Sequence, residues 1–119
     1  MRDFRRLKVW EKSHRLTLKI YQVSSGFPRE EMYGLTTQVR NASSSIPSNI
    51  AEGCGRIGDA DRARFFGIAM GSASELEYRF LLARDRGFMK PEKHQALDEQ
   101  VTEIKRMLTS LIQKLKADG

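Results

Sequence analysis

The chain has 119 residues, of which 39% are hydrophobic and 30% are charged, and its formal net charge is +6. This length predicts one domain, residues 1–119, that can bury a core without disulfides or metals. No apolar run approaches the ~20 residues of a membrane span, and the basic N-terminal stretch lacks the apolar segment of a signal peptide. Because the only cysteine is Cys54, a reducing compartment suits the chain, and we expect a cytoplasmic protein with no membrane partner.

Breaks rich in glycine and proline divide the chain into four segments with helical periodicity. The segments cover about 5–24, 30–53, 59–86 and 91–117, and the breaks between them have the chemistry of helix ends. No segment alternates with a period of two, so no strand is expected. Four long amphipathic helices with short connections predict an all-α fold, an antiparallel up-down-up-down four-helix bundle.

The first segment is apolar on two nearly opposite faces. One face holds Leu7, Trp10, His14, Leu18 and Tyr21, and the other holds Val9, Leu16, Ile20 and Val23. A helix docked in one bundle needs a single apolar stripe. The extra face therefore predicts a homo-oligomer, and the candidate interface residues are Val9, Trp10, Leu16, Ile20 and Tyr21. The alternative is a helix that is buried more deeply within a monomer.

The second segment contains a proline at position 47. Apolar side chains keep helical spacing across it, at Met32, Leu35, Val39, Ala42, Ile46 and Ile50. A new helix that began at Pro47 would have Ile46 as a poor N-cap. We therefore expect one helix that runs through Pro47 and bends there. Proline removes the hydrogen bond to the Ser43 carbonyl, for which Ser44, Ser48 or water would compensate.

The third and fourth segments carry regular apolar seams. The fourth has the 3-4 spacing of a helix packed at a shallow angle, at His94, Leu97, Val101, Ile104, Leu108, Leu111 and Leu115. The third adds a stripe of small residues, Ala63, Gly67, Gly71 and Ser74. Glycine inside a helix costs about 1 kcal/mol relative to alanine. Two glycines on one face therefore indicate that another backbone comes close.

Polar side chains recur at the edge of the core between the second and third segments. They are Ser45, Asn49 and Glu52 on one segment, and Ser72 and Glu75 on the other. A buried polar group is costly unless it is hydrogen-bonded, so a polar network between the two helices is expected. Such a network can fix helix register. A ligand site, or an enzyme that uses Asn49, Glu52 and Glu75, is the alternative.

Two other patterns resemble functional motifs without their context. Residues 53–58 read G-x-G-x-x-G, but a dinucleotide site needs a preceding strand, and a helix precedes this stretch. We expect a helix–helix turn with a left-handed residue at Gly53 or Gly55. His14, His94 and Cys54 do not form a metal-ligand set. The sequence thus predicts no catalytic residue, no metal and no cofactor.

Basic side chains concentrate at one end of the expected bundle. In an up-down bundle, the start of the first helix, the second turn and the end of the fourth helix meet there. That end collects Arg2, Arg5, Arg6, Lys8, Arg56, Arg62, Arg64, Lys114 and Lys116. A basic surface binds phosphate backbones without reading sequence, so RNA or DNA is the expected partner. A solvated end on a scaffold that binds only protein is the alternative.

Three stretches resemble a known family. They are LKVWEKSHRLTLKIY at 7–21, FPREEMYGLTTQVRNASSSIPSNIAEG at 27–53 and FGIAMGSASELEYRFLLARDRGF at 66–88. They look like the S23 or 23S rRNA intervening-sequence proteins, which are similar to the accessory variability protein of diversity-generating retroelements. The resemblance implies a four-helix bundle, a homopentamer, and a role in binding nucleic acid or a nucleic-acid-handling protein. It implies no established molecular function, and a non-catalytic oligomer is the resulting expectation.

Overall fold

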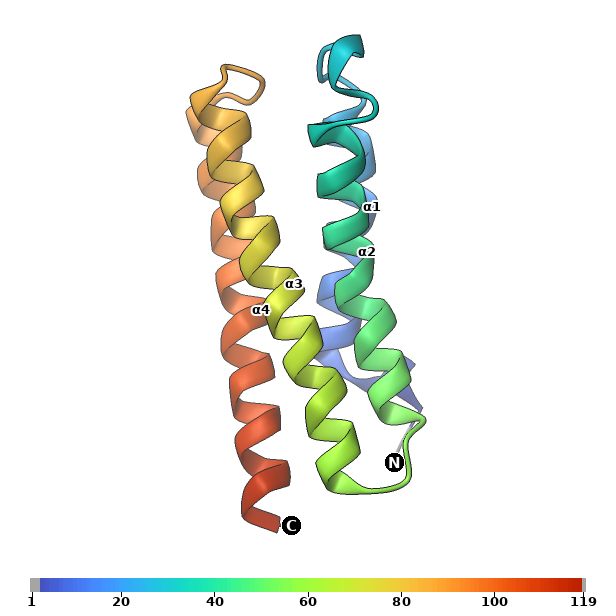
Figure 1. Ribbon diagram of the computed structural model, residues 1–119. Helices are drawn as coiled ribbons and strands as arrows, with labels where there is room; N and C mark the ends of the chain where they lie inside the picture. The colour runs from blue at the N-terminus through green and yellow to red at the C-terminus, as the bar shows by residue number, and fades with distance from the viewer. Residues whose placement is uncertain (1–2, 119) are drawn as a thin grey trace.

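The computed structural model describes residues 3–118, without the side chain of Asp118, and consists of four long helices that alternate in direction (Figure 1). The helices are α1 Lys8–Ser24, α2 Leu35–Cys54, α3 Asp59–Asp85 and α4 Pro91–Asp118. Two short 3-10 turns, η1 Phe4–Arg6 and η2 Arg29–Glu31, precede α1 and α2. The described part of the chain contains no strand. The predicted all-α, up-down-up-down bundle is confirmed.

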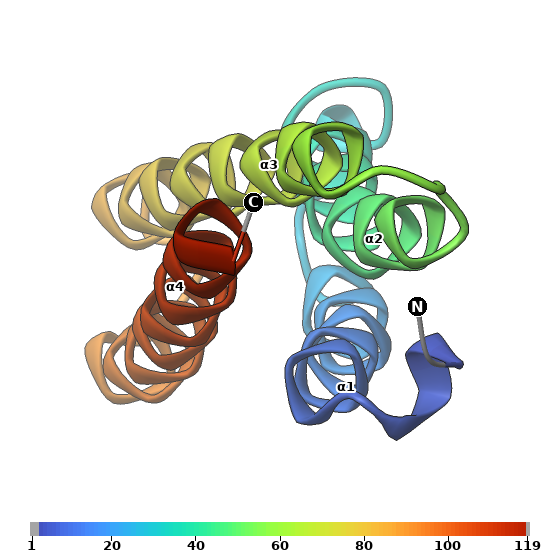
Figure 2. The same cartoon turned by 90° about the horizontal axis from the view of Figure 1, so that it is seen from below.

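The helices form a ring in chain order. Seen from below, α2 lies between α1 and α3, and α3 lies between α2 and α4 (Figure 2). The ring closes weakly, because α1 packs far less extensively on α4 than on α2. α1 and α3 are therefore diagonal to one another, and their outward faces point to different sides of the bundle.

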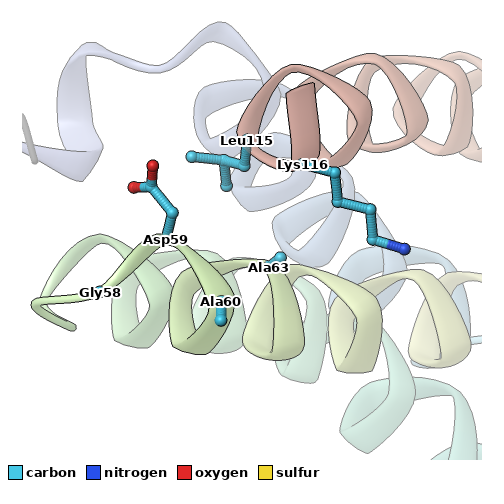
Figure 3. A pocket seen from close by; sticks show the side chains of 6 residues that line it. All are labelled: Gly58, Asp59, Ala60, Ala63, Leu115 and Lys116. Carbon is cyan, nitrogen blue, oxygen red and sulfur yellow. The ribbon is translucent and has the colours of Figure 1, made fainter. Parts of the chain in front are cut away.

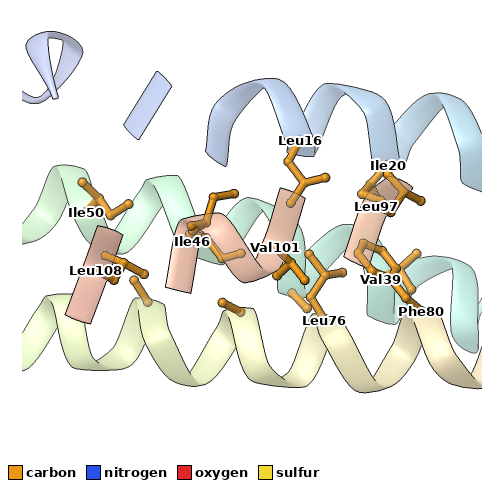
Figure 4. Packing of buried hydrophobic residues seen from close by; sticks show 14 of the residues in the cluster. Leu16, Ile20, Val39, Ile46, Ile50, Leu76, Phe80, Leu97, Val101 and Leu108 are labelled. Carbon is orange, nitrogen blue, oxygen red and sulfur yellow. The ribbon is translucent and has the colours of Figure 1, made fainter. Parts of the chain in front are cut away.

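The core follows the predicted seams (Figure 4). The fully buried side chains come from all four helices and include Leu16, Ile20, Val39, Ile46, Ile50, Phe66, Leu76, Phe80, Leu97, Val101, Ile104 and Leu108. On α4 the buried positions repeat at the predicted 3-4 spacing, so one stripe faces the other helices. None of the described helices is long and apolar enough to cross a membrane.

α2 begins later than the sequence pattern suggested. It starts at Leu35 rather than near residue 30, and the preceding residues form the turn η2. The backbone of Gly34 has φ −122° and ψ −113°, outside the helical region, and so separates the turn from the helix. Glu31 Oε1 then accepts a hydrogen bond from the Leu35 N–H at 3.2 Å. Met32, which was assigned to the apolar stripe, is 45% exposed.

α2 runs through Pro47, as predicted, and both Pro47 and Ser43 are buried. The Ser43 carbonyl, which loses its helical partner at this proline, accepts a hydrogen bond of 2.9 Å from Thr17 Oγ1 on α1. The expected compensation by Ser44 is wrong, because its hydroxyl donates to the Asn41 carbonyl instead. A tertiary contact therefore replaces the lost bond. The bend at Pro47 stays a prediction.

Gly53 lies inside α2 rather than in the following turn, and Gly55 has an ordinary φ of −82°. The expected left-handed residue at one of these positions is therefore wrong. Among the described residues, only Gly87, after α3, has a positive φ, at 80°. A Cβ at Gly53 would lie 2.7 Å from the Phe66 ring and 3.2 Å from the Arg62 carbonyl. Gly53 thus allows α2 and α3 to approach closely.

Candidate nucleic-acid interface

The structure places the predicted basic segments at one end of the molecule. The start of α1, the connection from α2 to α3 and the end of α4 all lie at the lower end in Figure 1. This basic end contains Arg5, Arg6, Lys8, Arg56, Arg62, Arg64, Lys114 and Lys116. Arg2, which was also predicted to bind nucleic acid, lies outside the described residues.

The arginines near the turn between α2 and α3 are neutralised locally. Arg62 Nη1 lies 2.7 Å from Asp59 Oδ1, and its side chain is only 15% exposed. Arg64 Nε lies 3.1 Å from Asp61 Oδ1. Arg56 lies 3.7 Å from that same carboxylate, and both Arg56 and Arg64 stack on the ring of Phe65. These three arginines therefore offer little free positive charge to a polyanion.

The start of α1 and the end of α4 keep their positive charge available. Four exposed side chains there have no carboxylate within 4.0 Å among the side chains that the structure describes: Arg6, Lys8, Lys114 and Lys116. Arg5 is exposed too, but it lies 3.1 Å from Asp3. The Arg5 backbone N–H bonds that carboxylate and lowers the pKa of Asp3. The free cations thus come from η1, the start of α1 and the end of α4, and not from the connection between α2 and α3.

A hollow of about 600 Å³ opens at this end between the start of α3 and the end of α4 (Figure 3). Its walls are mostly small or apolar and comprise Gly58, Asp59, Ala60, Ala63, Leu115 and Lys116. The one carboxylate in the wall, Asp59, is already bound to Arg62. Across the described residues, no three His, Cys, Asp or Glu side chains are grouped as a metal site would require. The hollow therefore lacks the converging groups of a catalytic site.

Part of the predicted polar network forms between α2 and α3. Ser45 Oγ lies 2.8 Å from Ser72 Oγ, and Asn49 Nδ2 donates to both the carbonyl and the hydroxyl oxygen of Ser45, at 2.8 and 2.9 Å. The prediction that Glu52 and Glu75 belong to this network is wrong. Both are exposed and pair with arginines four residues later, Glu52 at 3.7 Å from Arg56 just after α2 and Glu75 at 3.8 Å from Arg79 within α3. The carboxylates needed by the enzyme alternative do not converge.

We expect Asn49→Leu to lower the free energy of unfolding by about 1–3 kcal/mol. The leucine would leave the half-buried Ser45 and Ser72 hydroxyls without the amide that anchors their pair. Urea unfolding measures the change. The matched control is Asn41→Leu, an exposed asparagine on the same helix, for which little change is expected. Equal stability of the two variants would contradict a structural role for the trio.

The predicted interface residues on α1 divide into two groups. Val9, Leu16 and Ile20 are 4%, 1% and 1% exposed and belong to the core of the single chain. Their assignment to an oligomer interface is therefore corrected, because side chains that already pack against α2 and α4 leave no surface for a second copy. Trp10 is partly exposed and Tyr21 is 46% exposed, so the outward face of α1 keeps these two.

The outward face of α1 is a connected aromatic surface. The Phe4 and Trp10 rings meet edge to face with centroids 5.0 Å apart, and the Trp10 and His14 rings stack at the same separation. Leu18, 58% exposed, continues the face towards Tyr21, on whose ring Arg40 of α2 lies. The outer α1 face comprises Phe4, Trp10, His14, Leu18 and Tyr21. Phe4 and Trp10 are partly buried, whereas the other three side chains are exposed.

A second uncovered face lies on α3. Gly67, Gly71 and Ser74 are exposed, and a Cβ at either glycine would meet nothing within 4 Å. The same face continues into exposed Tyr78 and Leu81, which sequence reasoning did not single out. Their 4-3 spacing from Ser74 is the signal that would have found them. The outer α3 face therefore has small side chains at one end and bulky ones at the other. It comprises Gly67, Gly71, Ser74, Tyr78 and Leu81.

Both the sequence and the fold of this chain are similar to those of known proteins. The family model described as 23S rRNA-intervening sequence protein matches residues 5–110. The fold is similar to the crystal structure of a protein of unknown function of the S23 ribosomal protein family from Bacteroides thetaiotaomicron, with a TM-score of 0.82 and 26% identity. That similarity covers 87% of this chain and 97% of the other. No curated protein matches. This chain belongs to the 23S rRNA-intervening sequence protein family.

Proposed function

We propose that this protein is a non-catalytic homo-oligomer that binds RNA or DNA through the basic end of its bundle. The observation that carries the proposal is that four exposed cations at the same end of the bundle have no carboxylate within 4.0 Å among the described side chains: Arg6, Lys8, Lys114 and Lys116. In a complex, phosphate groups would supply the negative charge that no neighbouring carboxylate provides to these cations. The family's name refers to sequences that interrupt 23S rRNA, which supports a nucleic-acid ligand.

The chemistry of such binding is electrostatic. Lysine and arginine side chains that neutralise phosphates release condensed counterions, so affinity falls as salt rises, and the contacts carry no base information. The free cations are exposed side chains at one end of the bundle, where a flexible nucleic-acid backbone can contact more than one of them. Binding without sequence preference and with strong salt dependence follows from this arrangement.

Replacing Arg6, Lys8, Lys114 and Lys116 by glutamine should weaken RNA binding at least tenfold and flatten its salt dependence. Fluorescence anisotropy with a labelled single-stranded RNA, between about 50 and 200 mM salt, measures both effects. The matched control replaces four exposed cations at the opposite end, Arg29, Arg86, Lys90 and Lys93, and changes the net charge equally. An equal loss in both variants would show that only net charge matters.

The oligomer that we propose uses the two uncovered faces together. The outer α1 face presents large side chains such as Trp10 and Leu18, whereas the outer α3 face offers open space at Gly67 and Gly71. These faces lie on diagonal helices and so point to different sides of the bundle. The outer α1 face of one copy would therefore pack on the outer α3 face of the next, which is a head-to-tail contact. A head-to-tail contact that closes gives a ring. We propose a pentamer, in which the basic end would repeat around one rim.

Light scattering should give a particle several times heavier than the 13.6 kDa chain at micromolar concentration. Leu18→Glu and Gly71→Leu should each lower that mass, because one places a charge and the other a bulky group in the contact. Gly71→Leu has room in the single chain, so the helix itself should tolerate it. Gln100→Leu, an exposed position on α4, is the control. A wild-type mass near that of one chain would rule out the oligomer.

The second candidate is a scaffold that binds protein only, for example a nucleic-acid-handling protein. The ion pairs of Arg56, Arg62 and Arg64 favour it, because they remove part of the positive charge that the sequence predicts for this end. Absence of RNA and DNA binding at low salt, with the oligomer intact, would support this candidate over the first.

A further inference from the structure

An apolar groove of about 360 Å³ lies between the start of α1 and the end of α4. Leu7 and Val9 form one wall, and Met107 and Leu111 form the other. Leu7, Met107 and Leu111 are only partly buried in the single chain. The groove thus combines apolar walls with access from solvent.

The course of the N-terminal segment explains why the groove is uncovered. The turn η1 packs against α1 and α2, on the side of the bundle away from α4 (Figure 2). Further along the seam, the Lys12 ammonium lies 3.0 Å from Glu103 and joins α1 to α4. The groove is therefore bounded by an ion pair on one side and opens at the end of the bundle.

The α4 wall of the groove has the geometry of a helix-binding face. Its lining residues are Met107, Ser110, Leu111 and Lys114, which follow the i, i+3, i+4, i+7 spacing of one helical stripe over two turns. α1 and α4 are antiparallel neighbours, and the residues that line the open groove come from both sides of their contact. Amphipathic helices bind in such grooves through apolar anchors at the same spacing.

The positive charge of the groove indicates the charge of the helix that would bind there. Lys8 and Lys114 line the groove, and neither has a carboxylate within 4.0 Å among the described side chains. A second copy of this basic end would bring like charges together, and a nucleic acid has no aliphatic anchors for the apolar walls. We propose that the groove binds an amphipathic helix of a partner protein, with apolar anchors on one face and acidic side chains beside them.

A designed peptide of about 18 residues, long enough to form helix, provides the probe. It carries leucines at helical spacing on one face and glutamates beside them, with a fluorescent label. We expect saturable binding in fluorescence anisotropy, and at least tenfold weaker binding when the leucines are replaced by serines at equal charge. Equal binding of the serine peptide, or no saturable binding at low salt, would overturn the proposal.

Two protein variants locate the site. Ser110→Tyr fills the groove from an exposed position without changing charge, and should weaken peptide binding at least tenfold. Gln113→Tyr makes the same change at an exposed position on the same helix and should leave binding unchanged. Unchanged peptide affinity in Ser110→Tyr would refute the site. Because this variant keeps all four free cations, RNA binding should persist in it, and a failure of this proposal is thereby distinguished from a failure of nucleic-acid binding.

Discussion

Gly53→Ala should lower the free energy of unfolding by about 3 kcal/mol, towards the upper part of the range for overpacked cores. The added methyl would lie 2.7 and 2.9 Å from two atoms of the Phe66 ring and 3.2 Å from the Arg62 carbonyl. Phe66 is fully buried, so its ring cannot swing out into solvent. Relief therefore requires α2 and α3 to move apart. This loss would outweigh the better helix propensity of alanine.

The control for this prediction is Gly67→Ala, another glycine inside a helix. A Cβ at Gly67 meets nothing within 4 Å, so alanine should raise the stability by up to about 1 kcal/mol. Urea unfolding at a fixed protein concentration measures both variants, and light scattering in parallel follows the oligomeric state. Opposite signs for the two substitutions are the expected result. A stabilised Gly53→Ala protein would show that the contact between α2 and Phe66 is not close.

Thr17→Val should cost about 1–3 kcal/mol, because it leaves the buried Ser43 carbonyl without a hydrogen-bond donor. Valine has nearly the same shape as threonine, so packing changes little. The Thr17 hydroxyl also lies 2.9 Å from the Ser13 carbonyl, but that oxygen belongs to a continuous stretch of α1 and can keep its helical partner. The loss is therefore assigned to Ser43.

A double-mutant cycle with Pro47→Ala isolates this bond. Alanine at position 47 regains a backbone N–H that can donate to the Ser43 carbonyl within α2, so Thr17→Val should cost much less in that background. Urea unfolding of the four proteins gives the coupling energy, for which we expect about 1–2 kcal/mol. Pro47→Ala alone also changes buried packing, and the cycle cancels that contribution. A coupling energy near zero would contradict the compensation of the proline by Thr17.

The elements that the sequence predicts best are those with long periodic patterns. The seam from Leu97 to Leu108 appears in the structure at the expected spacing, and α2 continues through Pro47 because apolar residues keep their register across it. The start of α2 was misplaced, because Met32 fits the period while the backbone of Gly34 departs from the helix. Periodicity reports which side chains can share a face, but it does not report where the backbone turns.

The polar cluster and the basic end were predicted only in part. Helical spacing placed Ser45, Asn49 and Ser72 near the contact between α2 and α3, and hydrogen bonds join them. The same spacing admitted Glu52 and Glu75, whose longer side chains reach solvent and arginines four residues further along the chain. Likewise, the up-down order of the four helices predicted that the basic side chains lie at one end of the bundle. Which of them stay free depends on nearby carboxylates that are placed by folding.

The sequence by itself determined the four helices, their alternating directions, and the end of the bundle that carries the basic side chains, because these depend on local periodicity and short connections. Only the tertiary structure decided which apolar face of α1 points inward, that Thr17 compensates for Pro47, and that Gly53 faces Phe66. Each of these depends on the rotation and separation of two packed helices. Contacts between residues far apart in the chain determine both quantities, and no pattern within one segment records them.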